Sequence, residues 1–309
     1  MLNSFEEIKK QIKAGIRGGG SCKKVVVVSA EDEEVLQALR AAKDEGIADG
    51  ILIGDDCAIR EIASKHHISL DGLEIIHEPS QAKAGELGCT LVREARAQVI
   101  MKGLLDTSKF MQAILNKEKG LNSMGNLISH VALFELQSYS KLLLVTDAAI
   151  NIAPDLQQKS KIISNAVKVA QFLGREKPLV ACCCAVEKVN AGMPATVDAA
   201  LLSKMSERGQ IEGNCIVDGP LAYDNAISEE SARIKKISSP VAGKADIILC
   251  NDIESANYLY KSLIFSANAA AGAIVMGASA PVVLTSRADS HSNKFLSIVL
   301  AVLAADNRK

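Results

Sequence analysis

One segment of this sequence combines a positive charge, a glycine and two hydroxyls at the point where a predicted strand meets a predicted helix. It reads MKGLLDTS over residues 101–108. Lys102 can pair with an anion, and Gly103 permits close approach of a ligand to the backbone. Thr107 and Ser108 add hydroxyls at the start of the helix, where unpaired backbone N–H groups favour negative charge. The segment is a candidate anion site; an ordinary helix N-cap beside a solvated lysine is the alternative.

A second segment, TSRADS at residues 285–290, repeats this arrangement between a predicted strand and the last predicted helix. The Ser286 hydroxyl and the Arg287 guanidinium are suited to a tetrahedral oxyanion. Asp289 follows them, and a purely structural Arg–Asp pair beside a helix cap is the alternative. Two such segments in one chain favour a ligand that carries phosphate.

Other polar residues follow further predicted strands or lie on predicted helices. Asn257 and Lys261 are spaced to share one helical face, which makes them candidate ligand contacts, although surface or turn chemistry also explains them. The five histidines show no metal-ligand or triad spacing, and only His291, beside the second segment, is a candidate acid or base. The sequence contains no GxGxxG, GxxxxGK[ST] or GxSxG motif, which argues against the usual nucleotide-binding loops and serine hydrolases.

The elements that must position these residues alternate between short apolar runs and helical stretches, a pattern typical of βαβ units with mostly parallel sheets. Predicted strands cover residues 24–29, 50–54, 74–77, 98–101, 179–186, 215–217, 247–249, 273–276 and 282–284. Residues 128–134 and 141–145 lie so close together that a hairpin is expected. We therefore predict two α/β domains, residues 1–126 plus 279–309 and residues 127–278.

The composition favours a soluble protein with free thiols and excludes several classes. The 309 residues carry 35 Lys and Arg against 36 Asp and Glu, a net charge of −1, so no basic field is available for nucleic acid. The eight cysteines include no CxxC pair, which favours a reducing cytoplasm over disulfides or zinc. Residues 262–286 are uncharged, but glycine and proline interrupt them, so two buried strands are expected rather than a membrane helix. The N-terminus lacks the apolar core of a secretion signal, so we expect a cytoplasmic protein without a membrane partner.

Seven blocks of the sequence resemble the phosphate acetyl/butyryltransferase family, and more closely its shorter phosphate butyryltransferase branch. In chain order they are MKGLLDTSKF (101–110), VTDAAINIAPDL (145–156), MPATVDAALLSKM (193–205), GQIEGNCIVDGPLAYDNAIS (209–228), SPVAGKADI (239–247), ESANYLYKSL (254–263) and PVVLTSRADS (281–290). The resemblance covers the chain from about Gln98 onward. Residues 1–97 match only in their pattern of strands and helices.

This resemblance implies two α/β domains of the isocitrate/isopropylmalate dehydrogenase-like type, with the active site in the cleft between them. It implies the reaction butanoyl-CoA + phosphate ⇌ butanoyl phosphate + CoA, for short or branched acyl chains, by direct transfer in a ternary complex without metal or other cofactor. It also implies a homo-oligomer and an acyl (butyrate) kinase as a pathway partner. In the related acetyltransferases a Ser-Arg pair binds the phosphoryl group, and Ser286 and Arg287 match that pair. Lys102 and Thr107 lie in the block that forms the facing wall.

The resemblance leaves the general base open. The acetyltransferases place an aspartate seven residues beyond the serine, where this chain has Asn293, and an amide cannot take the CoA thiol proton. Asp289, His291 or the phosphate itself are the remaining candidates. An arginine of the 101–115 block is also absent, and Gln112 is the nearest residue.

Several other functions fit part of the pattern. Phosphate acetyltransferase differs only in acyl-chain length. A metal- and NAD-dependent dehydrogenase of the same fold would need a carboxylate cluster, and the sequence shows no close cluster of that kind. A non-catalytic acyl-CoA-sensing domain would not need the Ser286–Arg287 pair. An acyl-carrier-protein:phosphate acyltransferase would favour a basic docking face, which is not evident in the sequence.

Overall fold

The computed structural model describes residues 1–286 and 288–307 and divides into two compact units. The terminal unit contains residues 5–126 and the chain from Gly272 onward, and the central unit contains residues 1–4 and 127–271. The sequence-based division placed the return of the chain to the first unit at residue 279. In the structure the return falls between Ala271 and Gly272, inside a strand, which sequence periodicity could not reveal.

The terminal unit contains a sheet with the strand order β3-β2-β1-β4-β11-β10. The strands are β1 (Lys23–Val28), β2 (Ala48–Gly54), β3 (Glu74–His77), β4 (Val99–Lys102), β10 (Ala270–Met276) and β11 (Val282–Val283). Strands β3, β2, β1, β4 and β11 pair in parallel, and β10 pairs antiparallel with β11. The carboxyl ends of β1, β4 and β11 therefore lie along one edge of this sheet, and the segments that follow these strands begin there.

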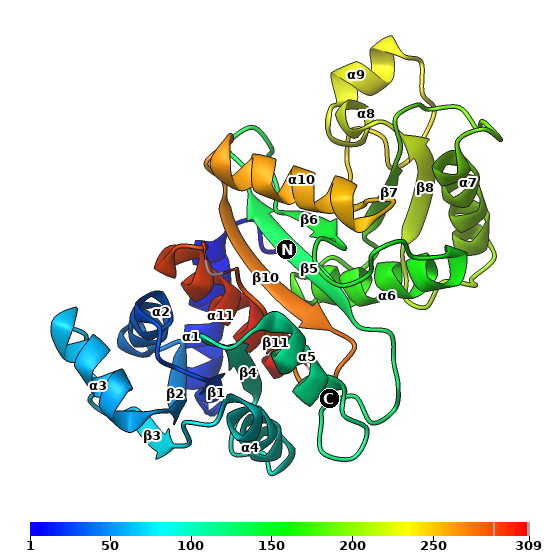
Figure 1. Ribbon diagram of the computed structural model, residues 1–309. Coiled ribbons are helices and arrows are strands. Elements are labelled where there is room, and N and C mark those ends of the chain that lie inside the picture. Colours follow the sequence, from blue (N-terminus) through cyan, green and yellow to red (C-terminus); the bar gives the residue numbers. More distant parts are fainter. Residues whose placement is uncertain (287, 308–309) are drawn as a thin grey trace. The chain divides into compact units, whose positions relative to one another are not determined.

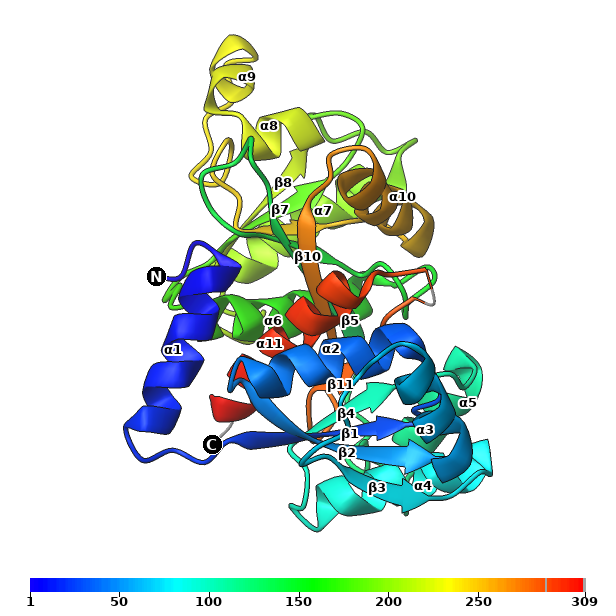
Figure 2. The ribbon, with the colours of Figure 1, turned by 90° about the vertical axis from the view of Figure 1, so that its left-hand side faces the viewer.

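Helices cover both faces of this sheet. On one face α2 (Glu33–Asp44) packs against α11 (His291–Asp306), and on the other α4 (Gln81–Arg93) packs against α5 (Thr107–Leu115), as Figures 1 and 2 show. In addition, α1 (Phe5–Arg17) contacts α11, and α3 (Asp56–Lys65) contacts β2 and β3. Most of α11 is buried, so it forms a central part of the core of this unit.

The central unit has the strand order β5-β6-β9-β7-β8. Its strands are β5 (Ser129–Glu135), β6 (Leu143–Thr146), β7 (Leu179–Cys183), β8 (Ile216–Leu221) and β9 (Ile247–Leu249), and its helices are α6 (Leu156–Phe172), α7 (Pro194–Glu207), α8 (Tyr223–Ile227), α9 (Glu229–Ile234) and α10 (Ile253–Phe265). Strands β5 and β6 pair antiparallel, which confirms the predicted hairpin. Strands β6, β9, β7 and β8 pair in parallel.

Local sequence signals explain where several of these elements begin. Asp155 accepts a hydrogen bond from the Gln158 N–H at 2.8 Å and forms a capping box at the start of α6. Asp252 and Ser255 form a second capping box at the start of α10. The predicted alternation of strands and helices is confirmed, although β7 ends at Cys183, three residues earlier than the sequence predicted.

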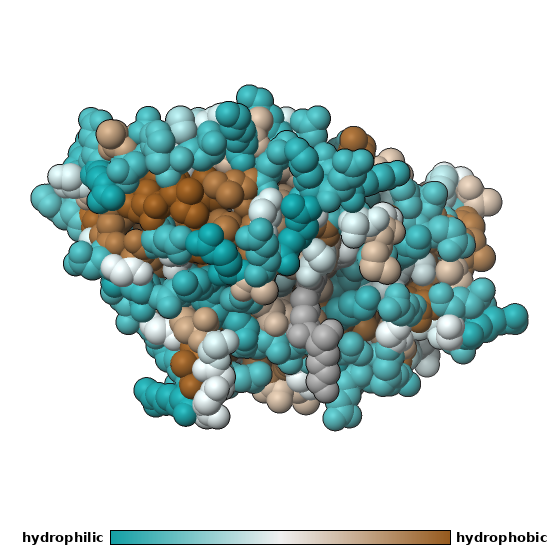
Figure 3. Space-filling view, turned by 90° about the horizontal axis from the view of Figure 1, so that it is seen from below, coloured by the Kyte–Doolittle hydropathy of each residue, from teal (hydrophilic) through white to brown (hydrophobic). Residues whose placement is uncertain are grey.

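The uncharged segment at residues 262–286 contains strands, as predicted, rather than one long helix. Strands β10 and β11 lie in the segment predicted to hold two strands, and no helix of the described residues is long and apolar enough to cross a membrane. The face in Figure 3 is rich in hydrophilic residues and is interrupted by an apolar area on its left-hand side. Ile75 and Ile76 of the edge strand β3 are only half-buried, so part of this sheet edge remains open to solvent.

Candidate active site

The structure brings the two predicted strand-end segments to neighbouring strands of the terminal unit. Strands β4 and β11 are parallel, with Met101 opposite Val283 in their register. The segment that begins at Lys102 and the segment that begins at Leu284 therefore leave the sheet side by side. This is the edge at which open α/β sheets bind their ligands.

The amine of Lys102 lies inside the turn that follows β4. The residue is 4% exposed, and its Nζ donates hydrogen bonds to the carbonyl oxygens of Gly103 at 3.0 Å and Leu105 at 3.2 Å. These bonds fix the path of the backbone between β4 and α5. The Lys102 amine thus binds two carbonyl oxygens of its own turn. The predicted contact of this amine with an anion stays a prediction.

Gly103 is required by the packing of two strands. A Cβ atom at this position would lie 1.9 Å from the carbonyl oxygen of Ser29, which follows β1. The N–H groups of Gly103 and Leu104 donate to the carbonyls of Val28 at 2.8 Å and Ser29 at 2.7 Å. Close approach of the β1 and β4 backbones therefore explains the glycine, whereas the sequence suggested close approach of a ligand.

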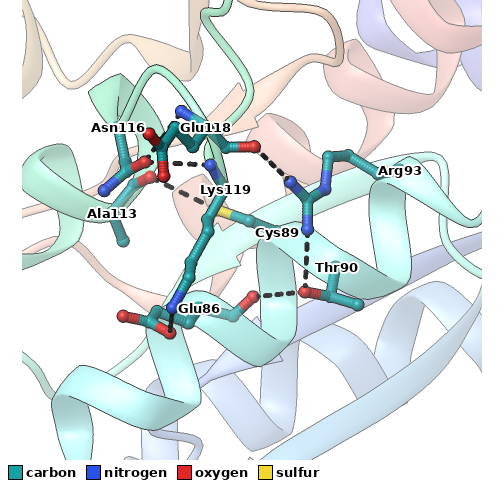
Figure 4. Close-up of polar contacts among 8 residues, drawn as sticks. All are labelled: Glu86, Cys89, Thr90, Arg93, Ala113, Asn116, Glu118 and Lys119. Carbon is teal, nitrogen blue, oxygen red and sulfur yellow. Dashed lines mark hydrogen bonds and ion pairs between the residues drawn. The ribbon is translucent and has the colours of Figure 1, made fainter.

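Thr107 and Ser108 are exposed and form the first residues of α5, so their hydroxyls lie at the edge where the ligand is expected. Contacts with α4 hold the opposite end of α5 and the turn behind it (Figure 4). Lys119 pairs with Glu86 at 3.1 Å, and the guanidinium of Arg93 donates to the Glu118 carbonyl at 2.8 Å. These contacts fix the segment after α5 against α4.

The turn after β11 is closed by hydrogen bonds between its own residues. The Ser286 N–H donates to Asp289 Oδ2 at 2.8 Å, and the Asp289 N–H donates to the Ser286 carbonyl at 3.2 Å. The Ala288 N–H lies 3.3 Å from Ser286 Oγ. Ser286 is exposed, whereas Asp289 is 5% exposed and its Oδ1 has no hydrogen-bond partner among the described residues. Arg287, the predicted phosphate ligand, lies outside the described residues.

The first turn of α11 contains a second candidate base, His291, and Asn293, which stands where the acetyltransferases have an aspartate. His291 is exposed, its Nδ1 lies 3.3 Å from Glu34 Oε2, and its backbone N–H donates to the same carboxylate. This pairing directs the imidazole toward α2. Asn293 is half-buried, and its N–H donates to the capping hydroxyl of Ser290 at 3.3 Å. The hydrogen bond between Asp289 and Ser286 places this carboxylate directly beside the predicted phosphate ligand.

The predicted contacts on α10 belong to the central unit. The side chain of Asn257 donates to the Ala148 carbonyl at 3.2 Å, which holds the loop after β6. The Lys261 Nζ lies 5.7 Å from the ring centroids of Tyr260 and Phe265. These contacts lie within the central unit, and the predicted ligand contacts of Asn257 and Lys261 stay predictions.

Sequence reasoning missed buried lysines that organise strand ends. Lys294 of α11 is 2% exposed, and its amine donates to carbonyls of the turn after β11. In the central unit, Lys159 is 4% exposed and binds Asp198 at 2.7 Å and Asn251 at 2.6 Å. The sequence did offer one signal for these residues, because each lysine falls at a position of its helix where the spacing of apolar residues predicts the core.

The cysteines are free thiols, as expected. Each one is unpaired in the described chain, and Cys89, Cys182 and Cys250 are buried. Burial raises the pKa of Cys89 to about 11 and that of Cys250 to about 12, because a thiolate is poorly solvated there. Within the described residues no group of three or more His, Cys, Asp or Glu side chains could hold a metal ion.

The fold and site together define an α/β protein with polar, hydroxyl-bearing turns at adjacent strand ends. The family model described as "Phosphate acetyl/butaryl transferase" matches residues 5–87 and 77–302. The chain therefore belongs to the phosphate acetyl/butyryltransferase family, whose members are phosphotransacylases.

Individual relatives agree with this membership over 93% or more of the chain. The chain is 49% identical over 308 residues to the phosphate butyryltransferase of Clostridium acetobutylicum, covering 100% of both proteins. It is 42% identical to the phosphate acetyltransferase of Thermotoga maritima, over 93% of this chain and 96% of that protein. The crystal structure of a branched-chain phosphotransacylase from Enterococcus faecalis V583 superposes with a TM-score of 0.81 at 31% identity, covering 93% of this chain and 100% of the other.

These comparisons confirm the predicted family and the mixed α/β character of the fold. The resemblance to isocitrate/isopropylmalate dehydrogenases and the cleft between the domains stay predictions. The roles of Lys102, Gly103, Thr107, Ser108, Ser286, Arg287 and Asp289 also stay predictions.

Proposed function

We propose that the chain is a phosphate acyltransferase of the butyryltransferase type, which catalyses butanoyl-CoA + phosphate ⇌ butanoyl phosphate + CoA. The observation that carries this proposal is the 49% identity to a phosphate butyryltransferase over the whole of both chains. The hydrogen-bonded turn that contains Ser286 supports it, because that turn stands at the sheet edge where a phosphate is expected.

In the proposed reaction the phosphate binds between the two strand-end turns of the terminal unit. Ser286 and Arg287 contact it from the turn after β11, and Thr107 and Ser108 contact it from the first turn of α5. A phosphate oxygen attacks the thioester carbonyl carbon, the C–S bond breaks and the CoA thiolate leaves. Holding both substrates at attack distance supplies much of the rate acceleration, worth about 7–11 kcal/mol in favourable intramolecular reactions.

Asp289 is the proposed proton carrier. Its Oδ2 holds the Ser286 N–H, and its buried Oδ1 has no partner among the described residues, so Oδ1 is the oxygen that we propose carries the proton. In the forward direction the proton of the attacking hydrogen phosphate passes through this carboxyl to the departing thiolate. In the reverse direction the carboxylate accepts the CoA thiol proton. His291 is less suited because Glu34 engages its imidazole.

We further propose substrates, an oligomeric state and a cellular compartment for this chain. The substrates are an acyl-CoA and inorganic phosphate, and the transfer needs no further cofactor. We expect a homo-oligomer, since symmetric assemblies are common among soluble enzymes. An acyl kinase would consume the acyl phosphate, and the free cysteines favour work in the cytoplasm.

The test is a thiol-release assay with acetyl-, butanoyl-, isobutanoyl- and octanoyl-CoA, each with and without phosphate. We expect phosphate-dependent release that is fastest with butanoyl- or isobutanoyl-CoA, and a loss of about 10²-fold or more in Arg287→Ala, as for other transition-state donors. Release that does not depend on phosphate, or activity of Arg287→Ala within twofold of the unmodified protein, would contradict the proposal.

Phosphate acetyltransferase is the second candidate, because the Thermotoga maritima acetyltransferase is 42% identical. A hydrophobic pocket discriminates between acyl chains by about 1–3 kcal/mol per methylene, or roughly 10- to 200-fold. A kcat/KM for acetyl-CoA above that for butanoyl-CoA in the same assay would favour this candidate.

A further inference from the structure

The turn that carries Ser286 rests on the buried amine of Lys294. Lys294 lies on α11 and is 2% exposed. Its Nζ donates hydrogen bonds to the carbonyl oxygens of Ser286 at 3.3 Å and Asp289. These two carbonyls flank the segment that carries the proposed phosphate ligands, so a single ammonium group holds both ends of the turn.

A lysine at this position is costly unless its charge is used. Most other buried residues of α11, among them Phe295, Ile298 and Val299, are apolar, although Ser297 is buried as well. An ammonium group removed from water loses most of its solvation free energy, and backbone carbonyls recover only part of that. An apolar side chain would fill the position at lower cost. The charge therefore has a use at this turn beyond filling the core.

Hydrogen bonding to the amine also sets the direction of a backbone donor. In a trans peptide the C=O and N–H groups point in opposite directions. An ammonium group that holds the Asp289 carbonyl thus turns the N–H of Ser290 away from Lys294. Ser290 is exposed and is the N-cap residue of α11, so this N–H belongs to the start of a helix, a kind of position at which proteins bind anions.

The neighbouring strand uses the same device. Lys102 at the end of β4 is 4% exposed and donates to the carbonyls of Gly103 and Leu105. Strands β4 and β11 are adjacent and parallel. Each of these neighbouring strand-end turns is therefore folded around a buried ammonium group, and both positive charges lie at the edge where a dianion is expected.

We propose that Lys294 is a positioning residue for phosphate: its charge holds the Ser286–Asp289 turn in the conformation that binds the anion, without contact between Lys294 and the substrate. This inference rests on the proposed function, because it assumes that the Ser286 turn binds phosphate. Loss of the Lys294 charge should therefore weaken the binding of phosphate and leave the binding of acyl-CoA nearly unchanged.

The test replaces Lys294 with Met, which keeps the length and removes the charge, and with Gln, which keeps a donor without charge. Lys23→Met is the matched control, since Lys23 is a partly buried lysine that pairs at 2.8 Å with Asp306 at the opposite end of α11. In both Lys294 variants we expect the KM for phosphate to rise at least tenfold and the KM for butanoyl-CoA to change less than threefold. Lys23→Met should leave both constants within twofold.

Two further measurements separate positioning from simple stability. The shift of the melting temperature caused by added phosphate should be smaller in Lys294→Met than in the unmodified protein. In the double variant with Ser286→Ala, the effects on phosphate KM should be smaller than the product of the single effects, because both residues act through one turn.

The outcomes distinguish this inference from the proposed function. If the unmodified protein shows no phosphate-dependent thiol release, the proposed function fails. If Arg287→Ala raises the phosphate KM but Lys294→Met and Lys294→Gln do not, only the role of Lys294 is overturned. Equal rises in both KM values, or failure of both variants to fold, would assign Lys294 to stability alone and also overturn it.

Discussion

Ser286 and Asp289 bind each other twice: the Ser286 N–H donates to Asp289 Oδ2 at 2.8 Å, and the Asp289 N–H donates to the Ser286 carbonyl at 3.2 Å. The carboxylate is buried, with 5% of the residue exposed. Asp289 therefore shapes the turn that presents Ser286, whether or not it also moves a proton. These two roles predict different results for different substitutions.

Substitution of Asp289 by Asn separates the two roles. The Asn side-chain oxygen can still accept the Ser286 N–H, but the amide cannot accept a proton. If Asp289 is the proton carrier, Asp289→Asn should lower kcat about 10²-fold, within the usual range for general acid–base residues, and leave the phosphate KM within threefold.

The matched variant Asp289→Ala removes both functions and should also raise the phosphate KM. Steady-state kinetics with butanoyl-CoA and phosphate measure both constants. A kcat for Asp289→Asn close to that of the unmodified protein would show that the phosphate itself handles the proton.

Gly103→Ala should destabilise the terminal unit. The added Cβ atom would lie 1.9 Å from the Ser29 carbonyl oxygen. This oxygen belongs to the backbone, so it cannot move aside without separating the chain after β1 from the chain after β4. We expect a loss of about 3 kcal/mol in the free energy of unfolding, at the upper end of the usual cost of overpacking.

Gly15→Ala in α1 is the control for this prediction, because an added Cβ atom at that position would have no neighbouring atom within 4 Å. Alanine is favoured over glycine inside a helix by about 1 kcal/mol, so this variant should be neutral or slightly more stable. Urea unfolding followed by circular dichroism compares the two. Equal stability of both variants would mean that β1 and β4 are not as close as described.

The cap of α10 predicts a pH-dependent contribution to stability. The backbone N–H of Ser255 holds the pKa of Asp252 below its ordinary value by hydrogen bonding to the charged form. A lowered folded-state pKa stabilises the protein above the unfolded pKa of about 3.9, and this contribution is lost as the pH falls through the folded pKa. Asp252→Ala should cost about 1 kcal/mol at pH 7 and progressively less below about pH 4.

Ser80→Ala supplies the control for the cap, since Ser80 is the N-cap residue of α4 but makes no side-chain capping bond. Melting temperatures of both variants between pH 3 and pH 7 are the measurement. A cost of Asp252→Ala that stays constant down to pH 3 would contradict the role of the carboxylate.

Much of the fold was predictable because its signals are local. Runs such as Val25–Val28 are apolar on both faces, as a buried parallel strand must be, and Asp155 marks the start of α6 by its capping chemistry. The hairpin of β5 and β6 followed from the short connection between two apolar runs. The crossing of the chain inside β10 was not predictable, because nothing in a continuous apolar strand marks a change of unit.

The candidate site was predictable in position but not in detail. Residue types showed where a strand end carries charge and hydroxyls, and the parallel register of β4 and β11 brings the two segments together. Sequence could not show that the Lys102 amine points to its own turn, that Gly103 faces the Ser29 carbonyl, or that Lys294 supports the second turn. Each of these depends on contacts between residues far apart in the chain or on a side-chain direction.

The division of the chain has a consequence for the order of synthesis. The central unit is almost contiguous, spanning residues 127–271 with only residues 1–4 added, whereas the terminal unit takes β11, most of β10 and α11 from residues 272–306. A ribosome therefore finishes all residues of the central unit before it finishes those of the terminal unit. Because α11 packs against β1 and β4, the core of the terminal unit can close only after the last helix of the chain has been made.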